Sequence, residues 1–279
     1  MTSLNDKTII IIGAAGGLGR SHALACAQAG ANLVLCDAGC SVAGQGHDPT
    51  GLDTLAEEVA RLGAAPVCHH GRIEAPETCA ILLDLAKTHF NQVDGLVWSA
   101  GVSRNRPLLL MSDEDLDAVL MTQVSAAIRV TRDVARVMSA GPGGSVVLTL
   151  GSTALLGAQH QANQAAAAGA LAGFVRSAAL DLRRHNVRVN GLAVLARTRV
   201  NADLPMFQRM DQATMTAAQI SPTVLYLLSA ASTHVSGEIV GAAGTRLYGI
   251  RVRDTPGYFF GETFDEEQVA GVFETAIRP

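Results

Sequence analysis

The feature that most constrains the fold of this chain is a glycine-rich turn between a predicted strand and a predicted helix. Thr8 to Ile12 is a short apolar run rich in β-branched residues, and it leads directly into Gly13-Ala14-Ala15-Gly16-Gly17-Leu18-Gly19. Leu18 to Ala29 then shows helical periodicity and ends at Gly30. A strand, a tight turn and a helix in this order predict the first unit of a βαβ fold.

Strand-like and helix-like segments continue to alternate along the chain. Expected strands cover residues 32–37, 65–68, 94–98, 145–150, 187–194 and 238–240, and expected helices cover 51–62, 75–89, 113–138 and 162–182. Ser112 is the expected N-cap of the helix 113–138. Strands separated by helices pair in parallel and are covered on both faces. The predicted fold class is therefore α/β, with a single Rossmann-type, doubly wound parallel sheet.

One domain is expected over residues 1–250, because apolar segments recur evenly and the 279 residues are 48% hydrophobic, enough to bury a core. Residues 251–279 are expected to form a C-terminal extension that packs on the same domain or on a neighbouring subunit. Its helix is predicted over 265–276. Its aromatic residues, Tyr258 among them, either fill a hydrophobic seam or fold over a functional site.

Charge and cysteine content exclude several classes of function. The net charge is −4 with acids and bases interspersed, so no basic stripe is available for nucleic acid. The chain has no leader-like N-terminus and no run of eighteen apolar residues, which predicts a cytoplasmic protein without a membrane span. Its five cysteines lie in the first third without Cys-x-x-Cys spacing. They are expected to be reduced structural thiols, and no metal site is expected.

The glycine turn also predicts a dinucleotide site. Glycines at 13, 17 and 19 allow a tight bend, close approach of a pyrophosphate and packing of the helix on the strand, and the helix N-terminus adds partial positive charge. Asp37 closes the second strand about 18 residues later, where it can accept hydrogen bonds from both ribose hydroxyls of NAD and repel the 2′-phosphate of NADP. The alternative is that the glycines only shape a turn and Asp37 only caps a loop.

From Thr8 to about Ala243 the chain resembles the short-chain dehydrogenase/reductase family. The glycine turn, Asp37, the strand that ends in Ala100-Gly101, and the segments 188–190 and 196–199 carry the resemblance. Within the family it is most similar to the group that includes the hydroxyacyl-CoA dehydrogenase units of peroxisomal multifunctional enzymes. The long loop from Asp37 to Gly51, the turn 17–20 and the segment 256–260 indicate this group.

The resemblance implies a set of NAD-binding residues: Gly13, Gly17, Leu18, Gly19, Asp37, Ile73, Ala100, Gly101 and Thr198. Three departures affect this site. Trp98 places an indole where relatives carry asparagine, and it is expected near the adenosine side. Arg72 stands where relatives carry an adenine-contacting aspartate, and Val194-Leu195 replaces a Pro-Gly pair.

The resemblance also implies that the catalytic set is lost. Members of the family carry an asparagine, a serine, a tyrosine and a lysine in a fixed order. The matching positions in this chain are Gln123, Gly151, Gln164 and Ala168. No shift of alignment restores Tyr-x-x-x-Lys, because the only lysines are Lys7 and Lys87 and the tyrosines are Tyr226, Tyr248 and Tyr258.

These substitutions bear directly on the chemistry. Hydride transfer to or from an alcohol needs a group that exchanges the hydroxyl proton near neutral pH, and the family uses a phenol whose pKa a nearby ammonium lowers. Neither glutamine nor alanine can replace it. Ser152 and His160 are the candidate substitutes, since histidine titrates in the right range.

Three functions remain open at this point. The first is a non-catalytic subunit that pairs with a homologous, catalytically intact member of the family, forming a dimer or tetramer through the helices 113–138 and 162–182. The second is an active NAD-dependent oxidoreductase that uses Ser152 and His160 on a hydroxyacyl-CoA, steroid-like or other secondary alcohol. The third is a sensor that binds NAD without reacting with it.

Overall fold

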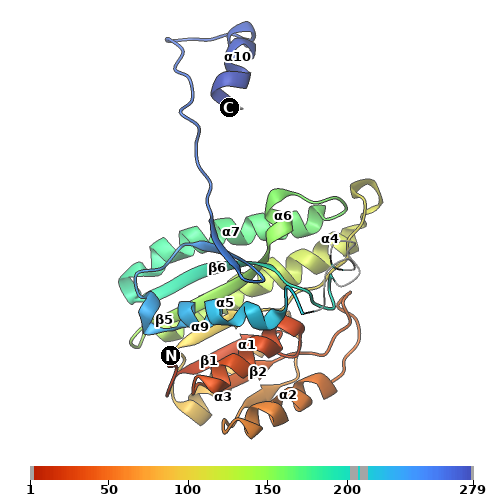
Figure 1. Cartoon of the computed structure of the whole chain (residues 1–279), viewed down its shortest axis with the longest axis vertical. Helices are drawn as coiled ribbons and strands as arrows, with labels where there is room; N and C mark the ends of the chain where they lie inside the picture. The colour runs from red at the N-terminus through yellow and green to blue at the C-terminus, as the bar shows by residue number, and fades with distance from the viewer. Residues whose placement is uncertain (1–2, 202–206, 208–212, 278–279) are drawn as a thin grey trace. The chain divides into compact units, whose positions relative to one another are not determined.

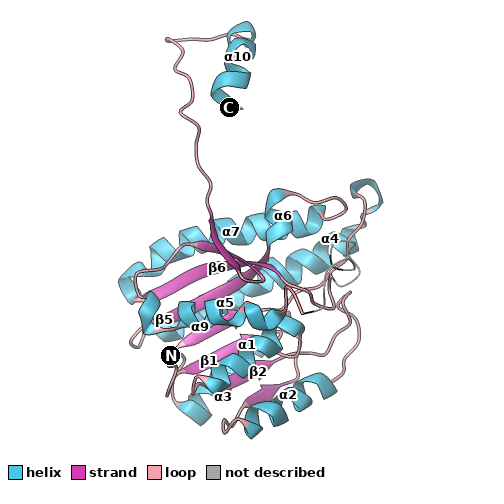
Figure 2. Ribbon diagram, in the orientation of Figure 1, coloured by secondary structure: helices cyan, strands magenta, loops and turns pink. Residues whose placement is uncertain are grey.

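The protein is described by a computed structural model that covers residues 3–201, 207 and 213–277. The chain divides into two compact units, Met1–Gly249 and Ile250–Pro279. In the first unit an eight-stranded sheet carries helices on both faces (Figures 1 and 2). The predicted α/β class with a single doubly wound sheet is therefore confirmed.

The strand order in the sheet is β3-β2-β1-β4-β5-β6-β7-β8. The strands are β1 Thr8–Ile12, β2 Asn32–Cys36, β3 Val67–His69, β4 Gly95–Trp98, β5 Gly144–Gly151, β6 Val187–Leu195, β7 Ile239–Ala243 and β8 Arg246–Ile250. Pairing from β3 through to β7 is parallel. The chain order reverses between β1 and β4, which is where open parallel sheets bind ligands at the carboxyl edge.

The helices follow the strands in the predicted alternation. They are α1 Gly17–Gln28, α2 Thr50–Arg61, α3 Thr78–Phe90, α4 Asp113–Leu120, α5 Ala127–Ser139, α6 Ser152–Leu156, α7 Ala162–Leu182, α9 Ser221–Leu228 and α10 Glu266–Val272. Every residue of β1 is buried, because helices cover both faces of a parallel sheet. On one face, Ile9 and Ile11 pack in a core with residues of α1, α2 and α9.

The predicted helix 113–138 is interrupted. Ser112 caps it as expected, because its Oγ accepts a hydrogen bond from the Asp115 nitrogen at 3.1 Å. Between α4 and α5, however, Met121–Ala126 forms a π-helical segment that contains Gln123. The wider turn changes the direction of the side chains by a fraction of a turn, and such segments often occur at functional sites.

The α7 helix has the predicted bounds and lies along the sheet. Ala167, Leu171 and Val175 are buried on its inner face, and the helix packs against β5 and β6. By length and hydropathy, residues 162–185 could also cross a membrane. The packing against the sheet buries 39% of this apolar window, and the outer face of the helix is left exposed, with Leu180 75% exposed.

The second unit consists of the C-terminal extension. Asp265 and Gln268 form a capping box at the start of α10, with each side chain accepting from the other's backbone nitrogen at 2.9 and 3.0 Å. Tyr258, Phe260 and Phe264 form a ring cluster with centroid distances of 5.0 and 4.7 Å. The aromatic residues thus contact one another inside the extension.

Candidate functional site

The glycine turn after β1 brings two strand ends into backbone contact. Gly13 has a φ of +76°, and a Cβ there would lie 2.5 Å from the Ala100 nitrogen. A Cβ on Gly19 would overlap the Gly13 carbonyl oxygen. Both positions therefore require glycine. The turn delivers the start of α1 to the carboxyl edge of the sheet.

The N-terminus of α1 is left without a side-chain cap. Gly16 is the N-cap residue, and the first turn contains no acidic residue. The first N–H groups of a helix have no partner within the helix, and the helix dipole places partial positive charge beside them. This end of α1 can therefore bind an anion such as a pyrophosphate.

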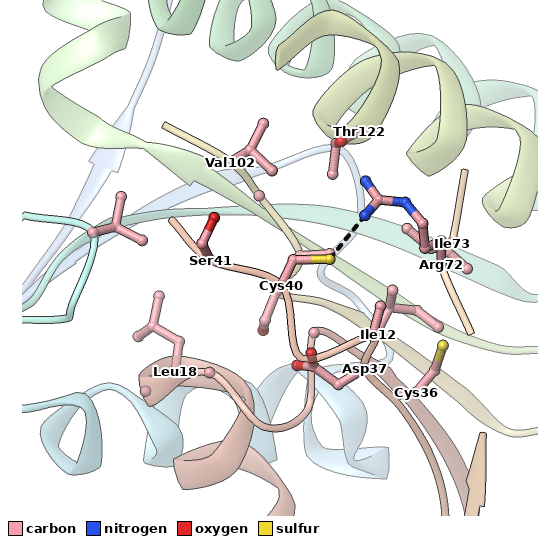
Figure 3. Close-up of a pocket in the computed structure, with 18 of the residues that line it drawn as sticks. Ile12, Leu18, Cys36, Asp37, Cys40, Ser41, Arg72, Ile73, Val102 and Thr122 are labelled. Atoms are coloured by element: carbon pink, nitrogen blue, oxygen red, sulfur yellow. Dashed lines mark hydrogen bonds between the residues drawn. The ribbon is translucent and has the colours of Figure 1, made fainter. Parts of the chain in front are cut away.

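A cleft of about 800 Å³, partly open to solvent, lies at this edge of the sheet (Figure 3). Most of the residues predicted to bind NAD line it: Gly13, Gly17, Leu18, Asp37, Ile73, Ala100, Gly101 and Thr198. Gly19 is not in the lining and serves the close packing of α1 on the turn. The structure thus brings these separate segments together around one cleft.

Asp37 connects the glycine turn to the loop that follows β2. Its Oδ2 accepts from the Ala15 nitrogen at 2.9 Å, and its Oδ1 accepts from the Gly39 nitrogen at 2.8 Å. Each carboxylate oxygen can accept a further hydrogen bond, and the residue lines the cleft. Asp37 therefore shapes the loop and is also placed to meet a ligand.

The expectation that Trp98 crowds the adenosine side is wrong. Trp98 is the last residue of β4, is fully buried and does not line the cleft. Its Nε1 donates to the Ala100 carbonyl oxygen at 3.0 Å. Because side chains alternate along a strand, the indole enters the core and Ser99 takes the cleft-facing position. Arg72, in contrast, does line the cleft.

Gln123 and Gln164, which the sequence analysis aligned with catalytic positions of the family, are joined by a hydrogen bond. Gln123 Nε2 donates to the Val102 carbonyl oxygen at 2.9 Å and to Gln164 Oε1 at 3.0 Å. Gln164 Nε2 donates to the same Val102 oxygen at 2.8 Å. Both protons of the Gln123 amide and one proton of the Gln164 amide are therefore used within the protein. Neither amide can exchange a proton with an alcohol near neutral pH.

The other two positions aligned with the family's catalytic set carry no polar side chain. Gly151 is the exposed last residue of β5, and Ala168 is 3% exposed on the inner side of α7. At Ala168 a methyl group packs into the core where the family's ammonium group would begin. The lack of a cation here leaves nothing to lower the pKa of a neighbouring acid.

Ser152 and His160 are not brought together. Ser152 is 5% exposed, and its Oγ donates to the Val194 carbonyl oxygen at 3.1 Å. His160 is exposed in the turn before α7, with a φ of +63°. No hydrogen bond joins these two described side chains. The structure therefore shows no assembled acid–base pair at the positions suggested from the sequence.

Burial affects four of the five thiols. Burial raises the pKa of Cys26 and of Cys36 to about 12, and that of Cys68 and of Cys79 to about 11. All five cysteines are free. Among the described residues no group of three or more histidine, cysteine or acidic side chains could hold a metal ion.

Sequence reasoning missed several residues of the cleft. Ser99 lines it, and its Oγ is buried without a hydrogen-bond partner. Cys40 and Arg199 also line it, although they come from loops after β2 and β6. The length of the loop after Asp37 was the only sequence signal, and it did not indicate where the loop lies.

The sequence profile of the short chain dehydrogenase family matches residues 7–205. The chain belongs to this family. It is 32% identical over 250 residues to hydroxyacyl-CoA dehydrogenase ChsB1 of Mycobacterium tuberculosis, which covers 85% of this chain and 77% of that protein. This places it in an oxidoreductase family, related to hydroxyacyl-CoA dehydrogenases.

A second relative is much longer. The chain is 29% identical over 258 residues to the peroxisomal hydratase-dehydrogenase-epimerase of Saccharomyces cerevisiae, which covers 92% of this chain and 28% of that protein. The chain thus spans little more than a quarter of this relative.

Solved structures share the fold. A short chain dehydrogenase from Mycobacterium avium has a TM-score of 0.85 at 25% identity and covers 98% of this chain and 95% of its own. Carveol dehydrogenase from Mycobacterium avium, solved in complex with NAD, has a TM-score of 0.78 at 22% identity. The match covers 87% of this chain and 98% of that chain.

Proposed function

We propose that this chain is a non-catalytic, NAD-binding subunit that assembles with a homologous, catalytically intact short-chain dehydrogenase in the cytoplasm. The partner would act on a hydroxyacyl-CoA or a related secondary alcohol. The observation that carries the proposal is the closed pair of Gln123 and Gln164 on the Val102 carbonyl, which occupies the place of proton-transfer groups beside an orderly cleft.

The residues of the cleft fit NAD. The uncapped start of α1 suits the pyrophosphate, and Asp37 keeps lone pairs for ribose hydroxyls. The buried Ser99 Oγ has no partner in the protein, and an unsatisfied buried hydroxyl is costly unless a ligand or water meets it. NAD would supply a hydride acceptor. The shared fold with NAD-bound carveol dehydrogenase supports the same conclusion.

The residues at the family's catalytic positions support the proposed loss of catalysis. General acid–base assistance typically contributes about 10²–10⁴ in rate, and the family positions hold two amides, a glycine and a methyl group. Ser152 is engaged with the Val194 carbonyl, so it does not replace the missing acid. A bound alcohol would lack a route for its proton.

Exposed faces of the long helices support assembly. Met121 and Val137 are 44% and 42% exposed on the π segment and α5, and Leu180 is 75% exposed on α7. A Cβ on Gly169 or Gly173 would meet nothing within 4 Å, so a neighbouring helix could approach α7 closely. We propose a dimer or tetramer formed through these helices.

Native mass spectrometry of the complex purified from its own host tests the assembly. The expected result is a heteromer with a short-chain dehydrogenase that carries an intact Tyr-x-x-x-Lys. Recovery of homomers alone would contradict the proposed partner. The mass of each subunit also shows whether NAD is retained.

An assay of the chain alone tests the loss of catalysis. With NAD and a 3-hydroxyacyl-CoA, NADH formation is expected at the background rate. Turnover typical of intact dehydrogenases would overturn the proposal. In that case the variants Ser152→Ala and His160→Ala would locate the acid–base group. His234→Ala, at an exposed site, is the control for both.

A further inference from the structure

The loop between β2 and α2 crosses the cleft. In the sheet, β2 and β6 are separated by β1, β4 and β5, so their ends are roughly 19 Å apart at about 4.8 Å per strand. Arg199, which follows β6, nevertheless donates from Nη2 to the Cys40 carbonyl oxygen at 3.0 Å. Both residues line the cleft, so this hydrogen bond bridges it.

A second arginine holds the same loop from the other side. Arg72, which follows β3, donates from Nη1 to Cys40 Sγ and to the Gly44 carbonyl oxygen, each at 3.0 Å (Figure 3). Cys40 is therefore the common point of two contacts, one through its thiol and one through its carbonyl. We call the contacts of Arg72 and Arg199 with Cys40 the cleft bridge.

The tip of the loop is fastened to the end of β4. The Ser103 nitrogen donates to the Val42 carbonyl oxygen at 2.8 Å, and Arg104 Nε donates to the Ala43 carbonyl oxygen at 2.9 Å. Gly44 packs closely on Val102, since a Cβ there would lie 2.8 Å from Val102 Cγ1. The loop is thus held across the segment 99–102, which forms the floor of the cleft.

The cleft bridge consists of few contacts. Its contacts run from two guanidinium groups to neutral acceptors, a carbonyl and a thiol, and a charged donor makes each bond stronger than one between neutral groups. Arg72 Nε also lies 3.6 Å from Glu74 Oε2, so Arg199 is the side of the bridge that a single broken contact releases. Among the described residues, Arg199 forms no ion pair with a carboxylate. Breaking the Arg199 contact would open the cleft on the side of β6 while the loop tip stays fastened to residues 103 and 104, and a local opening of this kind leaves the sheet folded.

From this geometry we infer that Arg199 and Arg72, through Cys40, retain a dinucleotide in the cleft. The inference rests on the NAD-binding part of the proposed function. The dinucleotide passes in or out only when the bridge opens, so opening limits association and release alike. NAD is then a long-lived resident of this subunit, as suits a chain that does not turn it over.

Stopped-flow fluorescence with NADH tests the bridge on the full chain. Association is followed on mixing, and release is followed by displacement with excess NAD. Arg199→Ala is expected to raise both rate constants about tenfold, as loss of one such hydrogen bond implies, and to leave Kd within about threefold. Cys40→Ala is expected to have a smaller effect in the same direction, since it removes the thiol contact and keeps the carbonyl.

Arg197→Ala is the matched control. Arg197 lies two residues away and outside the lining of the cleft, so its removal should change neither rate. Thermal melting of each variant confirms that it is folded. Faster release with unchanged association would overturn the bridge, because it indicates a direct contact between Arg199 and the coenzyme.

Unchanged rates in Arg199→Ala would also overturn it. Absence of NADH binding in the natural protein would overturn both the bridge and the NAD-binding part of the proposed function. Assembly with a partner is judged separately by mass spectrometry, so it can stand when the bridge fails.

Discussion

Single residues decide what chemistry this cleft can perform. Gln123 and Gln164 lie 41 positions apart in the chain, and they share the Val102 carbonyl oxygen. Three hydrogen bonds hold the two side chains together, and amide groups do not titrate near neutral pH. That both positions hold glutamine is read directly from the sequence. That the two side chains form a hydrogen bond depends on the position of α7 beside the π segment.

Another residue, His22, makes the stability of the fold depend on pH. Its side chain is fully buried in α1, Nδ1 lies 2.9 Å from Ser221 Oγ, and Nε2 has no partner. Burial lowers the pKa of His22 to about 4. The folded protein therefore keeps His22 neutral at pH values where the unfolded chain, with a pKa near 6.5, binds a proton.

We expect His22→Asn to flatten this pH dependence. The stabilisation from neutral His22 is complete above about pH 6.5 and is lost as the pH falls toward 4, because the unfolded state then binds more protons. The natural protein should lose roughly 1 kcal/mol more unfolding free energy between pH 7 and pH 5.5 than the variant. Urea unfolding at both pH values measures the difference.

The exposed His234 supplies the control. His234→Asn should leave the pH dependence of the natural protein unchanged. An equal pH slope in all three proteins would show that His22 is protonated in the folded state.

At the scale of elements, local signals placed most helices and strands to within a few residues. Capping residues and glycine stops are visible in the sequence, and Ser112 caps α4 as predicted. The π segment Met121–Ala126 carries no comparable signal. The strand β8 was missed because it follows β7 after only Gly244-Thr245 and lies at the edge of the sheet, mostly exposed.

The cap of α4 gives a second prediction. Ser112→Ala should lower the unfolding free energy by about 1 kcal/mol, because the Asp115 nitrogen loses its partner at the start of the helix. Ser112→Asp should keep the stability, since a carboxylate also accepts from this nitrogen and suits the helix dipole. Chemical denaturation of the two variants checks this, and equal losses would contradict a capping role.

At the scale of the whole molecule, the open face of α7 is the surface that the proposed assembly would use. A side chain at Gly173 meets nothing within the chain. Gly173→Trp should therefore preserve the fold of the subunit and disrupt assembly by filling the space for a neighbouring helix. Light scattering after size-exclusion chromatography should show a smaller particle with an unchanged circular dichroism spectrum.

A matched tryptophan on a different helix controls for added bulk. Ala60 is exposed on α2, which is not among the helices proposed for assembly. Ala60→Trp should leave the particle size unchanged. If Gly173→Trp also leaves it unchanged, the long helices do not form the interface.

The sequence by itself determined the alternation of strands and helices up to β7, the need for glycine after β1, and the lack of a Tyr-x-x-x-Lys set. These follow from local periodicity, local sterics and the chemistry of the residue types present. The expectation that Trp98 faces the cleft was wrong because one step along a strand reverses the direction of a side chain.

Only the tertiary structure decided which distant groups meet. Arg199 and Cys40 are 159 positions apart, and their contact exists because the sheet order places the loop after β2 across the ends of β1, β4 and β5. No local pattern encodes such a contact, since it depends on how far each loop travels over the carboxyl edge. The bridged cleft and the glutamine pair are therefore properties of the packed molecule.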